Sequence, residues 1–524
     1  MSSAYETADP KSPTRPRVTE PVTLAELAEL AELAELAELA GEFGLEVRGE
    51  ARVTGVSLSS QRVLPGDLYA ALPGSRAHGA SYAAGAVEAG AVAVLTDAAG
   101  AAELEAQGLG EVPVLLVERP RTVLGALSAR VYGNPSGRLR LIGVTGTQGK
   151  TTTTRLAESA LLDAGHRAGV IGTVGTRIGG RDVKTPLTTP EAPDLHGLFA
   201  RMVEEGTEAC AMEVSSHALV MGRVDGVVFD VAVFLNLGRD HLDFHETVED
   251  YYAAKADLFT PERAMLGIVN IDDEHGRRLA AEATIPILTY ALHDDTADWR
   301  ATDVELRPDG STFTVHGPDG LEFPGASPLA GDYNVSNTLA ALASIHHAYG
   351  DETVVRDVAT ALAKGSGVPG RLERIDEGQP FTVVVDYAHK PDAVEAALGT
   401  LRPLTESRLI VVIGAGGDRD TGKRPIMGEI SARLADHVIV TDDNPRTEDP
   451  ASIRRQVLEG TTGGSASVEE IGDRRAAIER AIGLAEPGDI VVVAGKGHET
   501  GQEINGVTHP FDDRDVVREA LARR

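Results

Sequence analysis

Three glycines stand at three-residue spacing in front of a lysine–threonine pair, in the order Gly143, Gly146, Gly149, Lys150 and Thr151. Glycines let backbone N–H groups approach phosphate oxygens without a clash from a Cβ atom. A lysine at this position can reach β- and γ-phosphates, and a threonine hydroxyl can bind Mg²⁺. These residues therefore predict a site for a nucleoside triphosphate with its magnesium ion.

A strand and a helix must hold this loop in place. Residues 139–144 are apolar enough for a buried strand, and residues 151–164 fit a helix whose N-terminus adds partial positive charge. The spacing departs from the general P-loop pattern, because Val144 stands where the first glycine would be. The alternative is a chance glycine-rich turn, which the order of strand, glycines, Lys-Thr and helix disfavours.

Composition narrows the class of protein. The chain has 524 residues, 42% of them hydrophobic, which is enough for about three or four domains with sizeable cores. Its 49 basic and 80 acidic residues give a formal charge of −31, which argues against nucleic acid or an anionic membrane as the main partner. The single cysteine, Cys210, excludes an internal disulfide and is expected in a core. No apolar run approaches the ~20 residues of a membrane span, so we expect a soluble, cytoplasmic protein.

Apolar runs of strand length alternate with helix-compatible segments, which predicts an α/β protein with parallel sheets. The strand-like runs are 92–96, 112–117, 209–214, 231–235, 267–271, 382–386, 409–413, 437–441 and 490–494. Ligands of such sheets bind beyond the carboxyl ends of the strands. Turn residues cluster at 134–137 and 365–370, which marks candidate domain boundaries.

Polar groups follow two of these strands downstream of the phosphate loop. Glu213 directly abuts an apolar run, and residues 236–243 gather amide, imidazole and carboxylate groups. Mg²⁺ prefers oxygen ligands and needs only one or two carboxylates beside phosphate oxygens. Each cluster alone would be an ordinary polar loop, but together they favour a metal site. Lys255 lies in a helix-like segment, where composition alone predicts a solvated lysine.

At this point the motifs resemble those of the Mur ligase family, which forms amide bonds with ATP during peptidoglycan assembly. The matching segments follow the family order and are 143–153, 212–217, 240–245, 249–255, 331–337 and 370–373. Pieces nearer both ends extend the resemblance over residues 45–520.

The resemblance implies an α/β protein of three domains: an N-terminal α/β uridine-nucleotide-binding domain, a central P-loop ATPase with a parallel sheet, and a C-terminal Rossmann-like domain. We place them at residues 45–138, 139–368 and 369–524, the last binding the amino acid. Residues 1–44 form an N-terminal extension, in which residues 24–40 repeat Leu-Ala-Glu and are expected to be helical. Thr23 and Glu26 would form a capping box at the start of that helix.

The resemblance also implies which residues bind ATP and Mg²⁺. The catalytic set is Lys150, Lys255 and His241, and the metal ligands are Thr151, Glu213, His241 and Lys255, with Lys255 carbamylated. ATP binding is expected at Gly146, Thr147, Gly149, Lys150, Thr151, Thr152, Asn334, Asn337 and Arg371. Carbamylation would turn a lysine cation into a two-oxygen anion able to help hold a second Mg²⁺.

Segments 56–63 and 65–79 resemble the uridine-binding domain of the members that add the third peptide residue. The residues implied to bind the UDP-sugar and its peptide are Ser57, Ser59, Ser75, His78, Gly79, Thr188, Thr189, Ser215, Met221 and Arg223. Some members carry glutamine where Met221 stands.

The segment Asp443-Asn-Pro-Arg446 resembles the signature by which members select diaminopimelate over lysine. Diaminopimelate carries an extra carboxylate at its far end, and an arginine can bind a carboxylate through two hydrogen bonds. An ordinary Asn-Pro turn would explain the position but not the arginine. The residues implied for this site are Arg419, Asp443, Asn444, Arg446, Gly495 and Glu499.

The expected activity is an ATP-dependent ligase, with ATP and Mg²⁺, that adds diaminopimelate to UDP-N-acetylmuramoyl-L-alanyl-D-glutamate through an acyl phosphate. The alternatives are a lysine-adding or folylpolyglutamate-type ligase, a P-loop kinase or GTPase, and a non-catalytic nucleotide-dependent binding protein. The meso and LL isomers of diaminopimelate are not distinguished, because they carry the same groups. The partners are small-molecule substrates, with no nucleic acid and no membrane, and we expect a monomer.

Overall fold

The computed structural model describes residues 13–30, 46–238, 244–365 and 367–524. The chain divides into two compact units. Unit 1 comprises Met1–Trp299 and Ala340–Val355, and unit 2 comprises Arg300–Leu339 and Arg356–Arg524. Strands and helices alternate in both units, so the predicted α/β class is confirmed.

The first sheet of unit 1 has five strands in the order β2-β7-β6-β5-β4, with β4 to β7 parallel and β2 antiparallel to β7. Its strands are β2 (Glu46–Arg48), β4 (Gly55–Ser57), β5 (Asp67–Ala70), β6 (Ala93–Thr96) and β7 (Val114–Leu116). Separate apolar clusters pack on its two faces, one including α4 and the other α2 and α3. The helices here are η1 (Ser60–Arg62), η2 (Gly79–Tyr82), α2 (Ala83–Glu88), α3 (Ala98–Ala106), α4 (Pro120–Val131) and η3 (Pro135–Arg138).

A short pair, β1 (Val22–Thr23) with β3 (Arg52–Val53), precedes this sheet. Residues 24–30 are helical, and Thr23 and Glu26 form the expected cap: the Glu26 N–H donates to Thr23 Oγ1 at 3.3 Å, and the Thr23 N–H donates to Glu26 Oε2 at 2.9 Å. The rest of the repeat up to residue 40 lies outside the described residues.

The second sheet of unit 1 carries the phosphate loop. Its strands run in the order β11-β10-β9-β12-β8-β13-β14-β15, parallel from β9 to β15. They are β8 (Arg140–Thr145), β9 (Ala168–Ile171), β10 (Thr176–Ile178), β11 (Arg181–Val183), β12 (Ala209–Glu213), β13 (Phe229–Phe234), β14 (Ala264–Asn270) and β15 (Ile287–Ala291). The helices are α5 (Lys150–Asp163), α6 (Ala192–Glu204), α7 (Ser216–Val220), α8 (Val248–Ala256), η4 (Asp257–Phe259) and α9 (Glu274–Glu282). Cys210 is buried in β12, where burial raises the pKa of its thiol, so it is a core residue as expected.

Unit 2 is organised around a six-stranded sheet in the order β19-β20-β24-β21-β22-β23, parallel apart from β19. Its strands are β19 (Glu373–Arg374), β20 (Thr382–Asp386), β21 (Leu409–Ile413), β22 (His437–Val440), β23 (Ser467–Glu470) and β24 (Ile490–Ala494). Alternate residues of each central strand enter different apolar clusters, one with α12 to α14 and one with α15 and α16. Two apolar faces explain why these strands are continuous apolar runs in the sequence.

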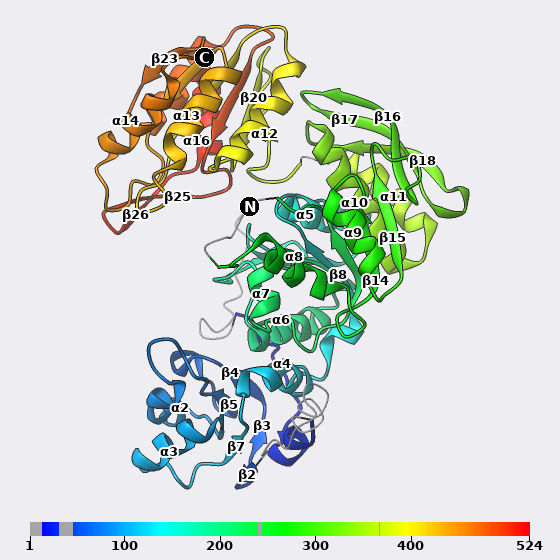
Figure 1. Cartoon of the computed structure of the whole chain (residues 1–524), viewed down its shortest axis with the longest axis vertical. Coiled ribbons are helices and arrows are strands. Elements are labelled where there is room, and N and C mark those ends of the chain that lie inside the picture. Colours follow the sequence, from blue (N-terminus) through cyan, green and yellow to red (C-terminus); the bar gives the residue numbers. More distant parts are fainter. Residues whose placement is uncertain (1–12, 31–45, 239–243, 366) are drawn as a thin grey trace. The chain divides into compact units, whose positions relative to one another are not determined.

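The helices of this part are α12 (Pro391–Leu401), η6 (Arg402–Leu404), α13 (Lys423–Leu434), α14 (Pro450–Thr461), α15 (Arg474–Leu484) and α16 (Asp513–Ala522), seen around the sheet in Figure 1. The remaining strands are the antiparallel β16 (Trp299–Arg307), β17 (Gly310–His316) and β18 (Glu322–Ser327), and the hairpin of β25 (Gly501–Ile504) and β26 (Val507–Pro510). The remaining helices are η5 (Pro318–Gly320), α10 (Asp332–Tyr349) and α11 (Glu352–Leu362). All nine predicted strands are present within a few residues of their expected bounds.

No helix among the described residues is both long and apolar enough to span a membrane.

Candidate active site

The phosphate loop has the predicted strand, glycine turn and helix. Strand β8 ends at Thr145, Gly146 and Gly149 have φ of +152° and +87°, and α5 begins at Lys150. These backbone conformations strain any residue with a Cβ, which explains the two glycines. The Lys150 ammonium donates to the carbonyl oxygens of Gly146 at 2.7 Å and Thr147 at 3.1 Å. The positive charge of Lys150 therefore lies close to the backbone of the phosphate loop.

Asn236 closes this loop, whereas the sequence named it only as the amide of the polar segment 236–243. Its Oδ1 accepts from the N–H groups of Thr147 at 3.1 Å and Gln148 at 2.9 Å, while its Nδ2 donates to the Gln148 carbonyl at 3.2 Å. Strand β13 places it there, because Phe234 pairs with Thr145 in the sheet. The sequence signals were its place directly after a strand-like run and its amide group in a polar segment, and neither indicated contact with the phosphate loop.

Glu213 lies beside the loop at the end of β12, where it pairs in register with Val144 of β8. Its carboxylate is buried, with 1% of the residue exposed. Oε1 accepts from Thr151 Oγ1 at 2.9 Å and from the Thr173 N–H at 2.7 Å, and Oε2 accepts from Thr173 Oγ1 at 3.1 Å. A Cβ on Gly172 would lie 2.3 Å from Oε1, so only glycine fits there.

Lys255 on α8 is also buried, with 1% exposed, so the composition-based expectation of a solvated lysine is wrong. Its ammonium donates to the Gly146 carbonyl at 2.9 Å and lies 4.5 Å from the centre of the Tyr251 ring. The sequence could not reveal the contact with Gly146, because that residue lies 109 positions away in the chain. His241, expected as a catalytic and metal-binding residue, lies outside the described residues.

Four of the residues expected to bind the sugar and peptide meet next to Glu213. Thr189 Oγ1 donates to the Glu213 carbonyl at 2.8 Å, and the Ser215 N–H donates to Thr189 Oγ1 at 3.3 Å. Arg223 donates to the Thr189 carbonyl at 3.4 Å. Thr188 lies within hydrogen-bond distance of Thr173, at 3.2 Å between hydroxyl oxygens.

One further member of this set, Met221, has a backbone contact nearby, and Arg223 has an ionic contact as well. The Met221 carbonyl oxygen accepts a hydrogen bond from the Arg121 side chain at 3.3 Å. The Met221 thioether sulfur is only a weak hydrogen-bond acceptor. Arg223 Nε lies 2.8 Å from Glu191 Oε1. Arg223 therefore contacts both the Glu191 carboxylate and the Thr189 carbonyl oxygen.

The uridine-binding candidates follow two neighbouring parallel strands of the five-stranded sheet. Ser57, at the end of β4, is buried and donates to the Ser59 carbonyl at 2.9 Å. His78 Nδ1 accepts from the Ala80 N–H at 3.0 Å, and its Nε2 lies 3.1 Å from Asp97 Oδ1.

The turn that contains Ser75 and Gly79 lies close to the backbone at the end of β5. A Cβ on Gly79 would lie 2.8 Å from the Leu72 backbone nitrogen, so the turn packs directly on the strand end, and Ser75 is exposed. Strands β4 and β5 pair in parallel, so both groups lie at the carboxyl edge of the sheet, where ligands of α/β proteins bind.

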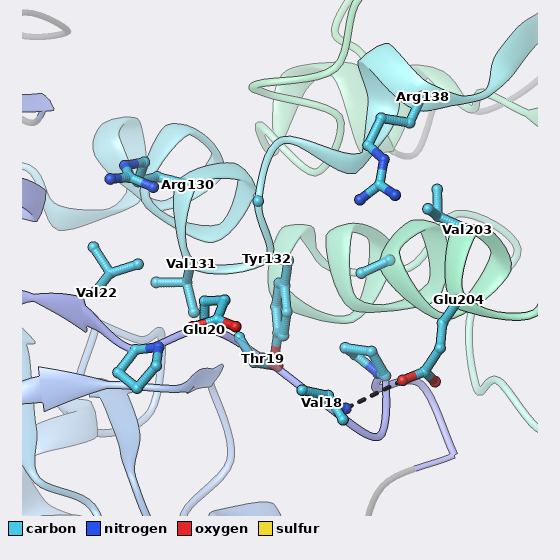
Figure 2. Close-up of a pocket in the computed structure, with 14 residues that line it drawn as sticks. Val18, Thr19, Glu20, Val22, Arg130, Val131, Tyr132, Arg138, Val203 and Glu204 are labelled. Atoms are coloured by element: carbon cyan, nitrogen blue, oxygen red, sulfur yellow. Dashed lines mark hydrogen bonds between the residues drawn. The ribbon is translucent and has the colours of Figure 1, made fainter.

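A cavity of about 490 Å³ lies elsewhere in unit 1 (Figure 2). It is lined by residues of the N-terminal segment, α4 and α6, with Glu204 accepting from the Val18 N–H. None of the predicted site residues lines it.

The remaining ATP-binding candidates belong to unit 2. Asn334 and Asn337 lie one turn apart on α10, both buried, with Asn337 Nδ2 donating to Asn334 Oδ1 at 3.3 Å. The Arg371 guanidinium lies 4.9 Å from the centre of the Tyr387 ring. Burial raises the pKa of the neighbouring Asp386 carboxyl, an effect that the Arg371 charge opposes.

The residues expected to bind the amino acid gather around a buried lysine that the sequence did not single out. Lys496 is fully buried, and its ammonium donates to Asn444 Oδ1 and Glu499 Oε2, both at 3.1 Å. Asn444 Nδ2 donates to Glu499 Oε2 at 2.9 Å. A Cβ on Gly495 would lie 2.4 Å from Asp443 Oδ2, which explains that glycine.

Arg446 is held in a left-handed backbone conformation, with φ of +51°. Its side chain donates to the Gly417 carbonyl at 2.6 Å and to Glu503 Oε2 at 3.2 Å. Arg419 belongs to the same glycine loop as Gly417, and its side chain is exposed. Arginine has five N–H donors, so these two bonds leave Arg446 further capacity for a carboxylate.

Three stretches of the chain match domains of one family. Residues 52–132 match the Mur ligase family catalytic domain, residues 144–345 the Mur ligase middle domain, and residues 370–497 the Mur ligase glutamate ligase domain. The chain belongs to the Mur ligase family.

Relatives of this family align along nearly the whole chain. The UDP-N-acetylmuramoyl-L-alanyl-D-glutamate--2,6-diaminopimelate ligase of Streptomyces coelicolor is 55% identical over 481 residues, covering 91% of this chain and 94% of the relative. The protein of that name from Synechococcus elongatus is 45% identical over 90% of this chain and 94% of the relative. A solved structure of a ligase with that name aligns with a TM-score of 0.66 and 36% identity, covering 90% of this chain and 95% of that one.

The donor set of this Mur ligase fits a magnesium nucleotide. Thr151 and Glu213 supply a hydroxyl and a buried carboxylate, the hard oxygen ligands that Mg²⁺ prefers while it keeps several waters. Gly146 and Gly149 leave the loop backbone open to phosphate oxygens. The metal site of a Mur ligase can therefore be built on these residues.

Proposed function

We propose that this protein is an ATP-dependent ligase that adds diaminopimelate to UDP-N-acetylmuramoyl-L-alanyl-D-glutamate, a step in making peptidoglycan precursors. The observation that carries the proposal is the buried Glu213 carboxylate, hydrogen-bonded to the Thr151 hydroxyl at the phosphate loop. The names of relatives that align over nine-tenths of the chain support the choice of substrates.

The reaction has two steps. The terminal carboxylate of the substrate attacks the γ-phosphorus of ATP, ADP leaves, and an acyl phosphate forms. The free amine of diaminopimelate then attacks the acyl carbon, phosphate leaves, and the nitrogen loses a proton to give the amide. A preorganised set of charges lowers the barrier for such transfers without any covalent enzyme intermediate.

Within the loop, the chain's own groups bind and orient the phosphates. Lys150 places its ammonium over the loop, and the N-terminus of α5 adds partial positive charge. Thr151, Glu213, His241 and carbamylated Lys255 would hold Mg²⁺, which supplies positive charge to the transferring phosphoryl group. Asn334, Asn337 and Arg371 would bind the nucleoside side of ATP.

The substrate carboxylate is brought to the loop by the peptide and sugar contacts. Thr188, Thr189, Ser215 and Arg223 would bind the sugar and peptide, and their contacts beside Glu213 support this role. The uridine end would lie on the residues that follow β4 and β5, namely Ser57, Ser59, Ser75, His78 and Gly79.

In unit 2, Arg446 would bind the far carboxylate of diaminopimelate, a group that lysine lacks. Glu499 can accept from its ammonium, with Asn444 and Lys496 fixing the orientation of the carboxylate. Arg419, Asp443 and Gly495 complete the proposed amino-acid site.

The test is phosphate release and product mass with ATP, Mg²⁺ and the UDP-dipeptide, comparing meso-diaminopimelate, LL-diaminopimelate and L-lysine. We expect release that depends on one diaminopimelate isomer, a product of matching mass, and none with a Lys150→Ala control. Equal or better turnover with lysine would overturn the substrate assignment. Nucleotide binding without release for any amine would overturn the ligase itself and favour a binding protein.

A further inference from the structure

Thr173 joins the two halves of the site in unit 1 and belongs to none of the residue sets considered above. It lies in the exposed turn between β9 and β10, and it contacts Glu213 twice, through its N–H at 2.7 Å and its hydroxyl at 3.1 Å. The same hydroxyl lies 3.2 Å from the hydroxyl of Thr188.

The number of hydrogen atoms fixes the direction of these bonds. A carboxylate only accepts hydrogen bonds, and a hydroxyl has a single hydrogen to donate. The Thr173 hydrogen therefore points to Glu213 Oε2, and Thr188 must donate to Thr173. The Thr188 oxygen is left with lone pairs alone, so it is oriented to accept a hydrogen bond from a ligand.

The same accounting applies to the carboxylate. Its two oxygens offer about four lone-pair sites. Oε1 accepts from Thr151 and from the Thr173 backbone, and Oε2 accepts from the Thr173 hydroxyl. Acceptor capacity remains on Oε2, which is the oxygen whose direction the Thr173 hydroxyl controls.

The turn that carries Thr173 is anchored to the phosphate-loop helix. Arg155, which is 5% exposed and one turn after Thr151 on α5, donates to the carbonyl oxygens of Val174 at 2.7 Å and Gly175 at 3.0 Å. The neighbouring Gly172 allows the turn to approach Glu213 closely. The Thr173 hydroxyl is thus held by the same helix that begins the phosphate loop.

We propose that Thr173 is a positioning residue, which fixes the Glu213 carboxylate for Mg²⁺ and orients the Thr188 hydroxyl to accept from the UDP-dipeptide. This inference rests on the proposed ligase function. Groups that orient metal ligands in this way typically change metal affinity or activity 10–100-fold when they are removed. Because the side chain is exposed, its loss leaves the core intact.

The experiment compares Thr173→Val, which removes only the hydroxyl, with Thr173→Ser, which keeps it. Thr185→Val is the matched control, because it breaks another threonine pair nearby, Thr176–Thr185 at 2.9 Å, without touching Glu213. For each protein we would measure kcat and KM for the UDP-dipeptide, and by calorimetry the affinity for ADP with and without Mg²⁺.

We expect Thr173→Val to lower kcat and the Mg²⁺-dependent gain in ADP affinity, each roughly tenfold or more. For Thr173→Ser, both values should stay within a few-fold of those of the wild type. For Thr185→Val, both values should equal those of the wild type. Wild-type values for Thr173→Val, or equal losses in Thr173→Ser or Thr185→Val, would overturn the proposal. The calorimetry needs no product, so it judges Thr173 separately even if wild-type protein joins no amine and the ligase proposal fails.

Discussion

Glu213 in unit 1 and Glu499 in unit 2 are both oriented carboxylates, but their partners differ in charge. Within the described part of the chain, Glu213 accepts hydrogen bonds from neutral groups, two hydroxyls and a backbone N–H. Glu499 accepts from the Lys496 ammonium and the Asn444 amide. Neutral donors fix the orientation of a carboxylate without neutralising its negative charge, so the carboxylate can still bind a cation. An ammonium donor neutralises that charge.

The difference suits two kinds of ligand. A site for Mg²⁺ needs uncompensated negative charge close to the phosphates. A site for an amino acid, which carries both signs of charge, needs a carboxylate and cations whose charges are already nearly balanced. Unit 2 follows this second pattern elsewhere too, because Arg474 is fully buried and pairs with Asp513 at 2.6 and 2.7 Å.

The largest effect should follow from removing the negative charge of Glu213, which also interacts through space with Arg155. Glu213→Gln keeps the shape but places an amide NH₂ where the carboxylate accepted hydrogen bonds. We expect ligase kcat to fall roughly 10²–10³-fold, the scale of losing one preorganised electrostatic group. Glu208→Gln, just before the other end of β12, is the control and should retain activity. Similar rates for both variants would contradict the role of Glu213.

Acid should destabilise unit 1 through His196, which lies on α6. Burial lowers the pKa of this fully buried imidazole to about 4, whereas the unfolded chain binds the proton near 6.5. Stability is therefore present above pH 6.5 and is lost as the pH falls through 4, by about 3 kcal/mol in total.

The measurement uses the single tryptophan, Trp299, which is buried in unit 1. Urea unfolding followed by its fluorescence at pH 7 and pH 4.5 should show the loss, and His196→Gln should make the dependence on pH weaker. The same pH dependence in that variant would assign the acid sensitivity to other groups.

Removing the Lys496 ammonium should leave Glu499 with the neutral Asn444 amide as a donor, which is closer to the surroundings of Glu213. Lys496→Met removes the buried ammonium that donates to Asn444 and Glu499, while the Asn444–Glu499 bond remains, and we expect unit 2 to lose about 2 kcal/mol of stability. Hydrogen exchange of the β24 amides would report this loss. Lys364→Met, at an exposed position of the same unit, should leave exchange unchanged. Unaltered β24 exchange in Lys496→Met would show that the ammonium contributes nothing to stability.

The smallest effect concerns selectivity. Arg446→Lys keeps the charge but cannot donate to Gly417 and Glu503 while also holding a ligand carboxylate through two bonds. We expect kcat/KM for diaminopimelate to fall roughly 10–100-fold, with little change for lysine. Arg433→Lys, on the surface of α13, is the control. An equal fall for both amines would mean that Arg446 supports the fold of the loop and not the choice of substrate.

The sequence by itself determined the α/β class, all nine predicted strands, and the order of strand, glycine loop and helix at residues 140–163. These features depend on apolar periodicity, on glycine conformations and on residues adjacent in the chain, which are all local properties. The family resemblance added the candidate residues that no local pattern marks, such as Lys255 and Arg446.

Only the tertiary structure decided which groups surround those candidates. It set the Lys255 ammonium against the Gly146 carbonyl, placed Asn236 under the phosphate loop, and brought Thr173 to Glu213 across 40 residues of sequence. It also revealed Lys496 as the fully buried partner of Glu499. The contacts of Asn236 and Thr173 arise where parallel strands bring distant loops to one edge of a sheet, and the spacing of residues along the chain carries no record of that register.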